Sequence, residues 1–260
     1  MKIFKVFALL LVSNFAFGQE IEKSKTPDNF NRLLVGINLS ADYNTVSLSD
    51  LFEDGTFSND FDKFEVPLPK PGYTAGVNLS YNFSKRLGLE FGFQYSNKGY
   101  ISRVLASTIP LGLSPGSQVY GIISTPEGPI GGVEVVKYIH NFNYLDIPLR
   151  AIVSFGKRRI RFVASAGIAA NLLLSTQKDQ VLELKNGEVK RFQDVYFSKD
   201  YHSFTISSTL SMGVDFQLSK KINLRIEPTY RYGLLPIHEY RQPRILWNYG
   251  LNLGFYYAIK

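Results

Sequence analysis

Two dipeptides hold side chains that could hydrolyse an ester or amide bond. His202-Ser203 offers a base and a nucleophile, and His238-Glu239 offers a second histidine with a carboxylate. Hydrolytic triads combine a hydroxyl, an imidazole base and a carboxylate that orients the base. Neighbouring residues of a strand point to opposite faces, so His202 and Ser203 cannot pair in a regular strand. The sequence has 3 histidines, all near predicted loops, and we expect them to be exposed rather than catalytic.

Charged residues form a second candidate site, because they recur at polar positions within otherwise apolar segments. They are Glu90, Asp146, Arg150, Arg161, Asp215, Arg225, Glu227 and Arg231. Acids and bases are equal in number in this set, so each charge can have a partner, as buried charges require. A catalytic carboxylate pair or a gated ion path is one interpretation. We favour a lumen charge network, because side chains must fill a barrel of eight strands.

The segments that carry these charges alternate between large apolar residues and small or polar ones. In Tyr73–Phe83, for example, Val77, Leu79 and Tyr81 share one face with other apolar residues. A period of two indicates a strand with two unlike faces. The predicted strands are Arg32–Asp42, Gly72–Phe83, Leu87–Tyr95, Asn143–Phe155, Ile160–Leu174, Ser203–Leu218, Lys221–Tyr232 and Leu246–Ile259. They predict an all-β fold, an eight-stranded antiparallel up-and-down transmembrane β-barrel.

The connections between these segments alternate in length. Three connections are long: Tyr43–Pro71, Ser96–Phe142 and Ser175–His202. The connections that alternate with them are tight turns. Long extracellular loops and short periplasmic turns are typical of outer-membrane barrels. The apolar face is too bulky to fit inside such a narrow barrel, so it is predicted to face lipid. Its aromatic residues gather at the two ends of the strands, as girdles at the membrane interfaces do.

The N-terminus resembles a secretion signal. Lys2 and Lys5 precede the apolar run Val6–Val12, and Ala16 and Gly18 supply small residues for cleavage. We therefore predict a signal peptide at residues 1–18, a periplasmic segment at residues 19–31 and an outer-membrane barrel domain at residues 32–260.

Composition excludes several classes of site. Among its 260 residues the chain has no cysteine, which excludes disulfides and thiolate metal sites. The net charge of +7 is modest, and the basic residues cluster in short turns rather than along one stripe, so no nucleic-acid partner is expected. We expect no cofactor and no metal ion.

The predicted extracellular loops are the candidate working surface. The stretch Ile101–Val136 is apolar and rich in glycine and proline, which are expected to keep it from forming a strand. Its exposed residues would be Ile109, Leu111, Leu113, Ile122 and Ile123. In the third loop, Asn186-Gly187 between two β-prone runs predicts a hairpin.

Several segments together resemble a known family. The chain is similar to the PorT-like outer-membrane barrel proteins of Bacteroidota in five segments: Gly88–Gly99, Tyr144–Arg150 (Tyr-Leu-Asp-Ile-Pro-Leu-Arg), Ala164–Gly167, Gly213–Asp215 and Leu224–Leu234. The resemblance covers essentially the whole chain after the signal. It implies an outer-membrane barrel, and the founding member of the family is linked to the type IX secretion pathway.

The sequence thus predicts a non-enzymatic outer-membrane barrel with a closed lumen. Its extracellular loops would act as an interaction surface or a structural element. Its partners would be outer-membrane lipid and lipopolysaccharide, and through the loops another envelope or secretion-system protein. The alternatives are an accessory component of the type IX secretion system and a lipid-A-modifying hydrolase.

Overall fold

The computed structural model describes residues 31–48, 66–105, 124–125, 128–129, 133–156, 159–193, 201–238 and 244–259. Its strands are β1 (Leu33–Leu48), β2 (Val66–Leu68), β3 (Lys70–Asn82), β4 (Leu87–Leu105), β5 (Ser124–Thr125), β6 (Gly128–Pro129), β7 (Val133–Phe155), β8 (Ile160–Leu184), β9 (Val189–Gln193), β10 (Phe204–Gln217), β11 (Ile222–Gly233) and β12 (Arg244–Ala258). In this part of the chain, no helix is long and apolar enough to cross a membrane. The predicted signal peptide lies outside the described residues.

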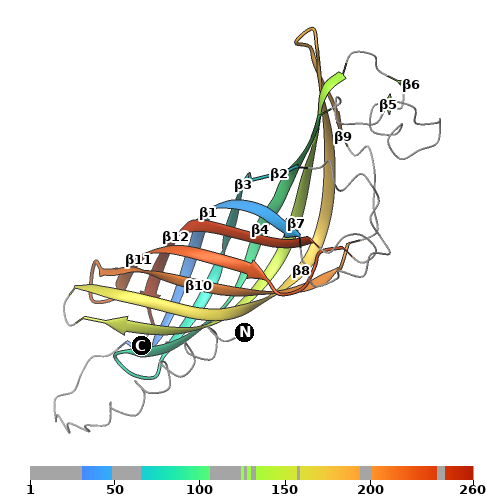
Figure 1. The fold of residues 1–260 in the computed structure, drawn as a ribbon. Helices are drawn as coiled ribbons and strands as arrows, with labels where there is room; N and C mark the ends of the chain where they lie inside the picture. Colours follow the sequence, from blue (N-terminus) through green and yellow to red (C-terminus); the bar gives the residue numbers. More distant parts are fainter. Residues whose placement is uncertain are drawn as a thin grey trace, which may run out of the picture. The chain divides into compact units, whose positions relative to one another are not determined.

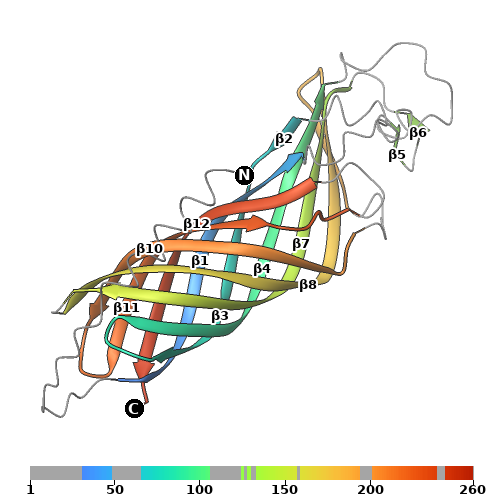
Figure 2. The same ribbon diagram turned by 60° about the horizontal axis from the view of Figure 1, so that its bottom comes forward.

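Eight strands pair in a ring, and each is antiparallel to the next (Figures 1 and 2). The order is β1, β3, β4, β7, β8, β10, β11 and β12, and β12 pairs back with β1. The all-β antiparallel prediction is confirmed, and eight is the number of strands in the ring. The sheet has 10 strands in total, because β2 pairs with β4 and β9 pairs with β8.

The two faces of the ring differ as the alternation predicted. On β1, Ile37 is 62% exposed, whereas its neighbour Asn38 is buried. On β3, Val77 is exposed and Asn78 is buried. The polar residues therefore fill the interior, and the apolar residues form the outer surface.

Aromatic side chains contact one another at both ends of this outer surface. Tyr230 lies 6.0 Å from Trp247, ring centre to ring centre, at the end of the ring with the long connections. Tyr81 and Phe83 are 5.2 Å apart at the end with the short turns. We call these ends the loop end and the turn end.

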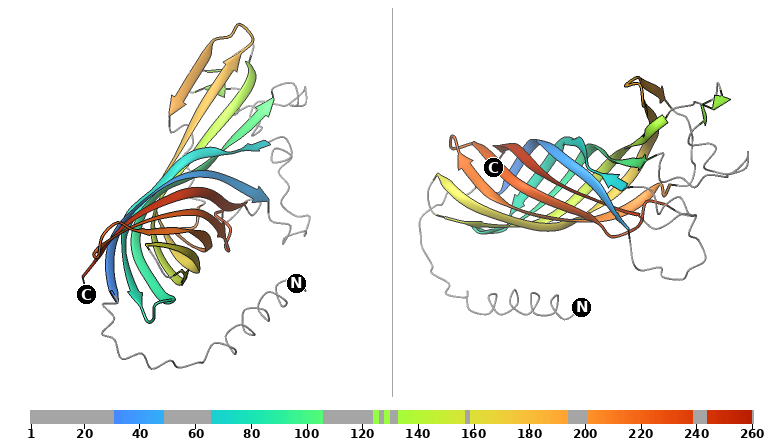
Figure 3. Two further views of the ribbon diagram at one scale, coloured as in Figure 1. Left: turned by 90° about the vertical axis from the view of Figure 1, so that its left-hand side faces the viewer. Right: turned by 45° about the horizontal axis from the view of Figure 1, so that its top comes forward.

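Four strands extend much further at the loop end than the sequence predicted. β4 continues past Tyr95 to Leu105, β7 begins at Val133 rather than Asn143, and β8 continues past Leu174 to Leu184. β1 similarly continues to Leu48. Figures 1 and 3 show β4, β7 and β8 reaching beyond the other strands, with β9 beside the end of β8. We call the part formed by residues 98–105, 133–143, 174–184 and 189–193 the sheet extension.

In the sheet extension each face mixes apolar and polar residues, and buried Val135 and Val181 lie on the same face as Lys137. The inward side carries buried Val104, Val136 and Leu182, while exposed Arg103 lies on the outward side. The apolar-outward alternation thus stops where the strands leave the ring, although the strands continue. The loss of a strict alternation explains why the strand ends were predicted too early, and why Ile101–Leu105 and Val133–Val136 were wrongly predicted to be loop. Ile109, Leu111, Leu113, Ile122 and Ile123 lie outside the described residues.

The predicted hairpin after β8 is confirmed. Glu183 pairs with Val189, and the turn between them contains Asn186 and Gly187. Gly187 has a φ of 84°, a left-handed conformation that glycine adopts without steric cost. The Asn186 side chain accepts a hydrogen bond from the Glu188 N–H at 3.0 Å, which closes the turn locally.

A charge placed on the outward face tests whether this face contacts lipid. Leu253 pairs with Leu39 on β1 and Ile226 on β11, so both of its cross-strand partners are aliphatic. Leu253→Arg is expected to reduce the free energy of unfolding in lipid vesicles by about 2–4 kcal/mol, because a charge would be placed in hydrocarbon. Urea titration measures this change. Val189→Arg, at an exposed position of the β9 hairpin, is the matched control and is expected to have little effect. Equal costs at both positions would contradict lipid contact at Leu253.

Candidate functional site

A charged cluster crosses the interior of the ring. Glu90 on β4 pairs with Arg150 on the adjacent strand β7, and Arg225 Nη1 on β11 lies 3.0 Å from Glu90 Oε2. Because β4 and β11 lie on opposite sides of the ring, the second pair spans the interior. Glu227 Oε2 is 3.8 Å from Arg150 Nη1, which completes a set of two acids and two bases. All four side chains are buried, so each charge depends on the others for compensation.

Tyr256 on β12 holds this central cluster in place. Its hydroxyl donates a hydrogen bond to Glu90 Oε2 at 3.0 Å, and the Arg225 guanidinium lies 4.4 Å from its ring centre. The ring has room because two neighbours are glycines. A Cβ at Gly36 would lie 2.5 Å from Tyr256 Cδ1, and one at Gly254 would lie 2.6 Å from Tyr256 Cε2. The absence of a side chain at both glycines therefore leaves the space that the tyrosine ring occupies.

Two further ion pairs lie closer to the loop end. Arg231 Nη1 is 3.0 Å from Asp42 Oδ1, and Asp42 also accepts hydrogen bonds from Ser40 at 2.6 Å and Thr74 at 2.5 Å. The other pair joins Lys98 Nζ to Asp146 Oδ2 at 2.8 Å. Asp146 also accepts hydrogen bonds from the side chains of Ser96 at 2.8 Å and Asn171 at 2.6 Å. These carboxylates are thus satisfied by several donors each.

One more pair lies toward the turn end. Arg161 Nη2 is 2.6 Å from Asp215 Oδ2, and the two residues are direct partners of β8 and β10. The Asp215 side chain is buried, whereas the Arg161 side chain retains 28% exposure. This pair therefore lies where the interior begins to open toward solvent.

The structure brings the predicted charged residues together in the interior, but in several groups. Glu90, Arg150, Arg225 and Glu227 form one cluster, while the other four pair elsewhere. Sequence reasoning missed Asp42 and Lys98, the partners of Arg231 and Asp146. Both residues share the inward period of their strands, since Asp42 follows Ser40 and Lys98 follows Ser96. That signal was present, but Lys98 was assigned to a loop.

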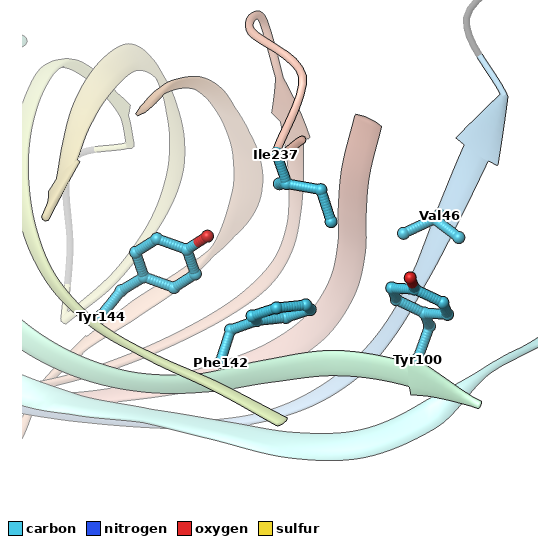
Figure 4. Close-up of a cluster of buried hydrophobic side chains, with 5 residues drawn as sticks. All are labelled: Val46, Tyr100, Phe142, Tyr144 and Ile237. Carbon is cyan, nitrogen blue, oxygen red and sulfur yellow. The ribbon is translucent and has the colours of Figure 1, made fainter. Parts of the chain in front are cut away.

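An aromatic layer lies over the ion pairs at the loop end. Val46, Tyr100, Phe142, Tyr144 and Ile237 form a buried cluster in which the side chains point toward one another (Figure 4). The layer joins β1, β4 and β7 to the segment after β11.

Three interactions link this layer to its polar surroundings. The Lys98 ammonium lies 5.1 Å from the ring centre of Tyr144, and Arg244 donates a hydrogen bond to the Tyr100 hydroxyl at 3.0 Å. His140 stacks on Tyr100 with their ring centres 4.4 Å apart. The layer is therefore continuous with the ion pairs beneath it.

Two small cavities lie between these side chains. One interior cavity, lined in part by Lys98, Tyr144 and Arg231, has a volume of about 20 Å³. Another, lined in part by Gln94, Asp146 and Arg150, has a volume of about 10 Å³. A water molecule needs roughly 10–15 Å³ measured in this way, so these spaces hold water at most.

The residues considered for hydrolysis take part in packing near the loop end. His238 is buried, its ring centre 4.6 Å from that of Tyr201, and the two residues form an isolated β-bridge. The His202 N–H donates to the Ile237 carbonyl at 3.0 Å, while Ser203 is exposed. Glu239 lies outside the described residues. The expectation that the histidines are exposed is wrong for His140 and His238, because both are buried in the aromatic layer and its surroundings.

Within the described ranges, no three His, Asp or Glu side chains are grouped so that they could hold a metal ion. The ion pairs instead suit a structural role, since every acidic group among them faces a base.

Removing one base tests the central cluster. Arg225→Met leaves Glu90 and Glu227 with a single arginine, so one buried carboxylate loses its charge compensation. The free energy of unfolding is expected to fall by about 3–5 kcal/mol, measured by denaturant titration in lipid vesicles. Adding Glu90→Gln restores neutrality and is expected to recover part of the loss.

The control variant removes a cation from a partly exposed pair. Lys137→Met breaks the pair with Glu183 in the sheet extension, where both side chains are about one-third exposed. Its expected cost is below about 1 kcal/mol. A loss in Arg225→Met no greater than in Lys137→Met would show that the central pairs are not energetically coupled.

Comparison with solved structures returns small outer-membrane proteins. The crystal structure of Neisserial surface protein A is 12% identical, covers 86% of this chain and 97% of that chain, and has a TM-score of 0.42. Ail, the attachment invasion locus protein of Yersinia pestis, is 10% identical over 87% of this chain and 99% of its own, with a TM-score of 0.36. The outer membrane enzyme PagL is 11% identical over 84% and 97%, with a TM-score of 0.35.

Comparison with curated proteins gives no match. A sequence family, described as the outer membrane protein beta-barrel domain, matches residues 17–239. This match covers well over half of the chain and includes most of the strands of the ring. The chain therefore belongs to the outer membrane protein β-barrel domain family and is an outer-membrane protein.

Proposed function

We propose that this chain is a non-enzymatic outer-membrane barrel protein with a closed interior, and that it acts through its loop end as a surface for another envelope protein. The observation that carries the proposal is the contrast between the two parts of its long strands. Within the ring they enclose ion pairs and an aromatic layer. Beyond the ring, β4, β7 and β8 continue as the sheet extension.

The filled interior argues against transport. An ion moving along the ring would have to separate the pair between Glu90 and Arg225, which spans it. It would then meet the aromatic layer, in which Tyr100 and Phe142 are almost completely buried. At both places the ion would break stabilising contacts and would find no continuous water-filled path. A structural interior fits these contacts better than a channel.

The sheet extension supplies a surface outside the membrane. β8 leaves its partner β10 at Leu172 and runs on to Leu184, a distance of roughly 40 Å at the rise of a β-strand. The long connections of outer-membrane barrels are extracellular, so this surface projects from the cell. Its outward side carries Arg103, Lys137 and Asp179 on three adjacent strands, interspersed with apolar residues such as Ile139. Such a surface can meet lipopolysaccharide at its base and a protein partner above it.

A second candidate is an accessory component of the type IX secretion system. The resemblance of Tyr144–Arg150 to PorT-like proteins favours it. In this structure, two charged residues of that segment are inside the ring, where Asp146 pairs with Lys98 and Arg150 pairs with Glu90. The segment therefore supports a shared barrel interior, and the partner would be selected by the loop end.

Conductance tests the closed interior. The purified wild-type protein in planar lipid bilayers is expected to show no steady conductance, because the ion pairs and aromatic layer block the ring. A porin prepared in the same detergent serves as the positive control. A stable open channel of discrete size in the wild type would contradict the proposal.

Shortening the longest connection tests the interaction surface. Leu105 on β4 pairs with Val135 on β7, so residues 106–132 can be replaced by a short Gly-Ser linker without removing either strand. The variant is expected to fold, as judged by heat-modifiable migration, but to lose co-purifying envelope proteins and to fail in rescuing a deletion strain. Shortening the turn at residues 84–86 is the control. Full rescue with unchanged partners would show that this connection is not the working surface.

A further inference from the structure

An apolar groove lies on the outward face of the ring near the turn end. It runs over β11, β12, β1 and β3, which are consecutive strands of the ring. Its volume of about 360 Å³ is within the range of roughly 300–1,000 Å³ found for small-molecule sites. The side chains that line it are Val35, Ile37, Val77, Ile222, Phe255 and Tyr257.

The groove arises from unequal side chains on paired strands. Val35 of β1 pairs with Tyr257 of β12, and Ile37 pairs with Phe255. On the other side of β1, Ile37 pairs with Val77 of β3. Two aromatic rings thus stand beside a run of shorter aliphatic residues, which leaves a trough along β1. Since all four strands have backbone partners on both sides, an occupant can contact only side chains here.

Basic residues gather at the turn end of this groove. Lys221 directly precedes β11, and its ammonium lies 5.8 Å from the ring centre of Tyr257, a groove residue. Lys220 is exposed in the same turn, and its carbonyl accepts a hydrogen bond from Asn31 at 2.8 Å, which brings the start of the described chain alongside. Exposed Arg32 follows Asn31. The neighbouring stretches 31–37, 77–82, 219–224 and 253–259 contain no Asp or Glu.

We propose that this groove and its basic rim form a binding site for one anionic phospholipid of the periplasmic leaflet. The short turns of outer-membrane barrels face the periplasm, so the basic residues lie at the level of the inner-leaflet headgroups. An acyl chain fills the trough along Ile37 and Val77. The phosphate is held by Lys220, Lys221 and Arg32, because basic residues at a membrane surface attract anionic lipid.

A flexible acyl chain suits the groove better than a protein segment does. The groove offers no free backbone donor or acceptor, so an added strand would gain no ladder hydrogen bonds. A second copy of the chain would have to bury about 1,000 Å² or more, beyond the lining of this trough. A lipid needs only the apolar walls and the charges at one end, and both are present.

Native mass spectrometry tests the proposal. The full-length protein is released from nanodiscs that contain equal amounts of phosphatidylglycerol and phosphatidylcholine, and the lipids that stay bound are counted. The wild type is expected to retain one phosphatidylglycerol in preference to phosphatidylcholine by roughly tenfold. Lys220→Glu with Lys221→Glu is expected to abolish this preference. Val77→Trp fills the trough and is expected to remove the bound lipid.

Matched controls separate the site from general lipid contact. Arg159→Glu changes an exposed basic residue between β7 and β8, two strands that do not line the groove, and Met212→Trp enlarges an exposed residue of β10, so both are expected to keep the bound lipid. The lysine variants lie in an exposed turn, which keeps the test valid if Val77→Trp fails to fold. Equal retention in all variants, no preference between headgroups, or a lipid-free dimer would each overturn the proposal.

Discussion

The pairing of Glu90 with two arginines is the constraint on which the interior depends. A ring of eight strands is too narrow to hydrate separate charges, so each must meet an opposite charge from another strand. Glu90 pairs along the wall with Arg150 and across the interior with Arg225. The contact with Arg225 fixes the relative positions of β4 and β11, which share no backbone hydrogen bonds. The ion pairs thus complement the ladder, which links only neighbouring strands.

The glycines of the wall follow from the same constraint. Tyr256 reaches Glu90 from β12, and its ring occupies the space that side chains at Gly36 and Gly254 would fill. The outward neighbours of these glycines are large, so at these positions the strands carry bulky side chains on the outer face and none on the inner face. Each inward glycine therefore leaves space for the Tyr256 ring, rather than marking a flexible point in the strand.

The part of the fold that the sequence predicts is the part in which the two faces of a strand have different surroundings. The alternation predicted every strand of the ring, because lipid on one side and a polar interior on the other impose a strict period of two. The sheet extension was missed because the strict alternation ends there: buried Val104, Val136 and Leu182 lie on the inward face, and polar and apolar residues share the outward face. The inward charges were predicted from strand period, but the contact between Glu90 and Arg225 depends on the stagger of the strands around the ring, which one sequence does not display.

The closed interior proposed above also determines where binding would occur. A ligand would then reach the protein only from outside the ring, and the two ends offer different chemistry. At the loop end the sheet extension presents charged residues such as Arg103 and Lys137, which suits a protein or a sugar-rich surface. At the turn end the trough along Ile37 opens to hydrocarbon and stops at Lys221, which suits an amphiphile. The proposed function and the proposed lipid site therefore use two separate surfaces, each matched to the surroundings that it meets.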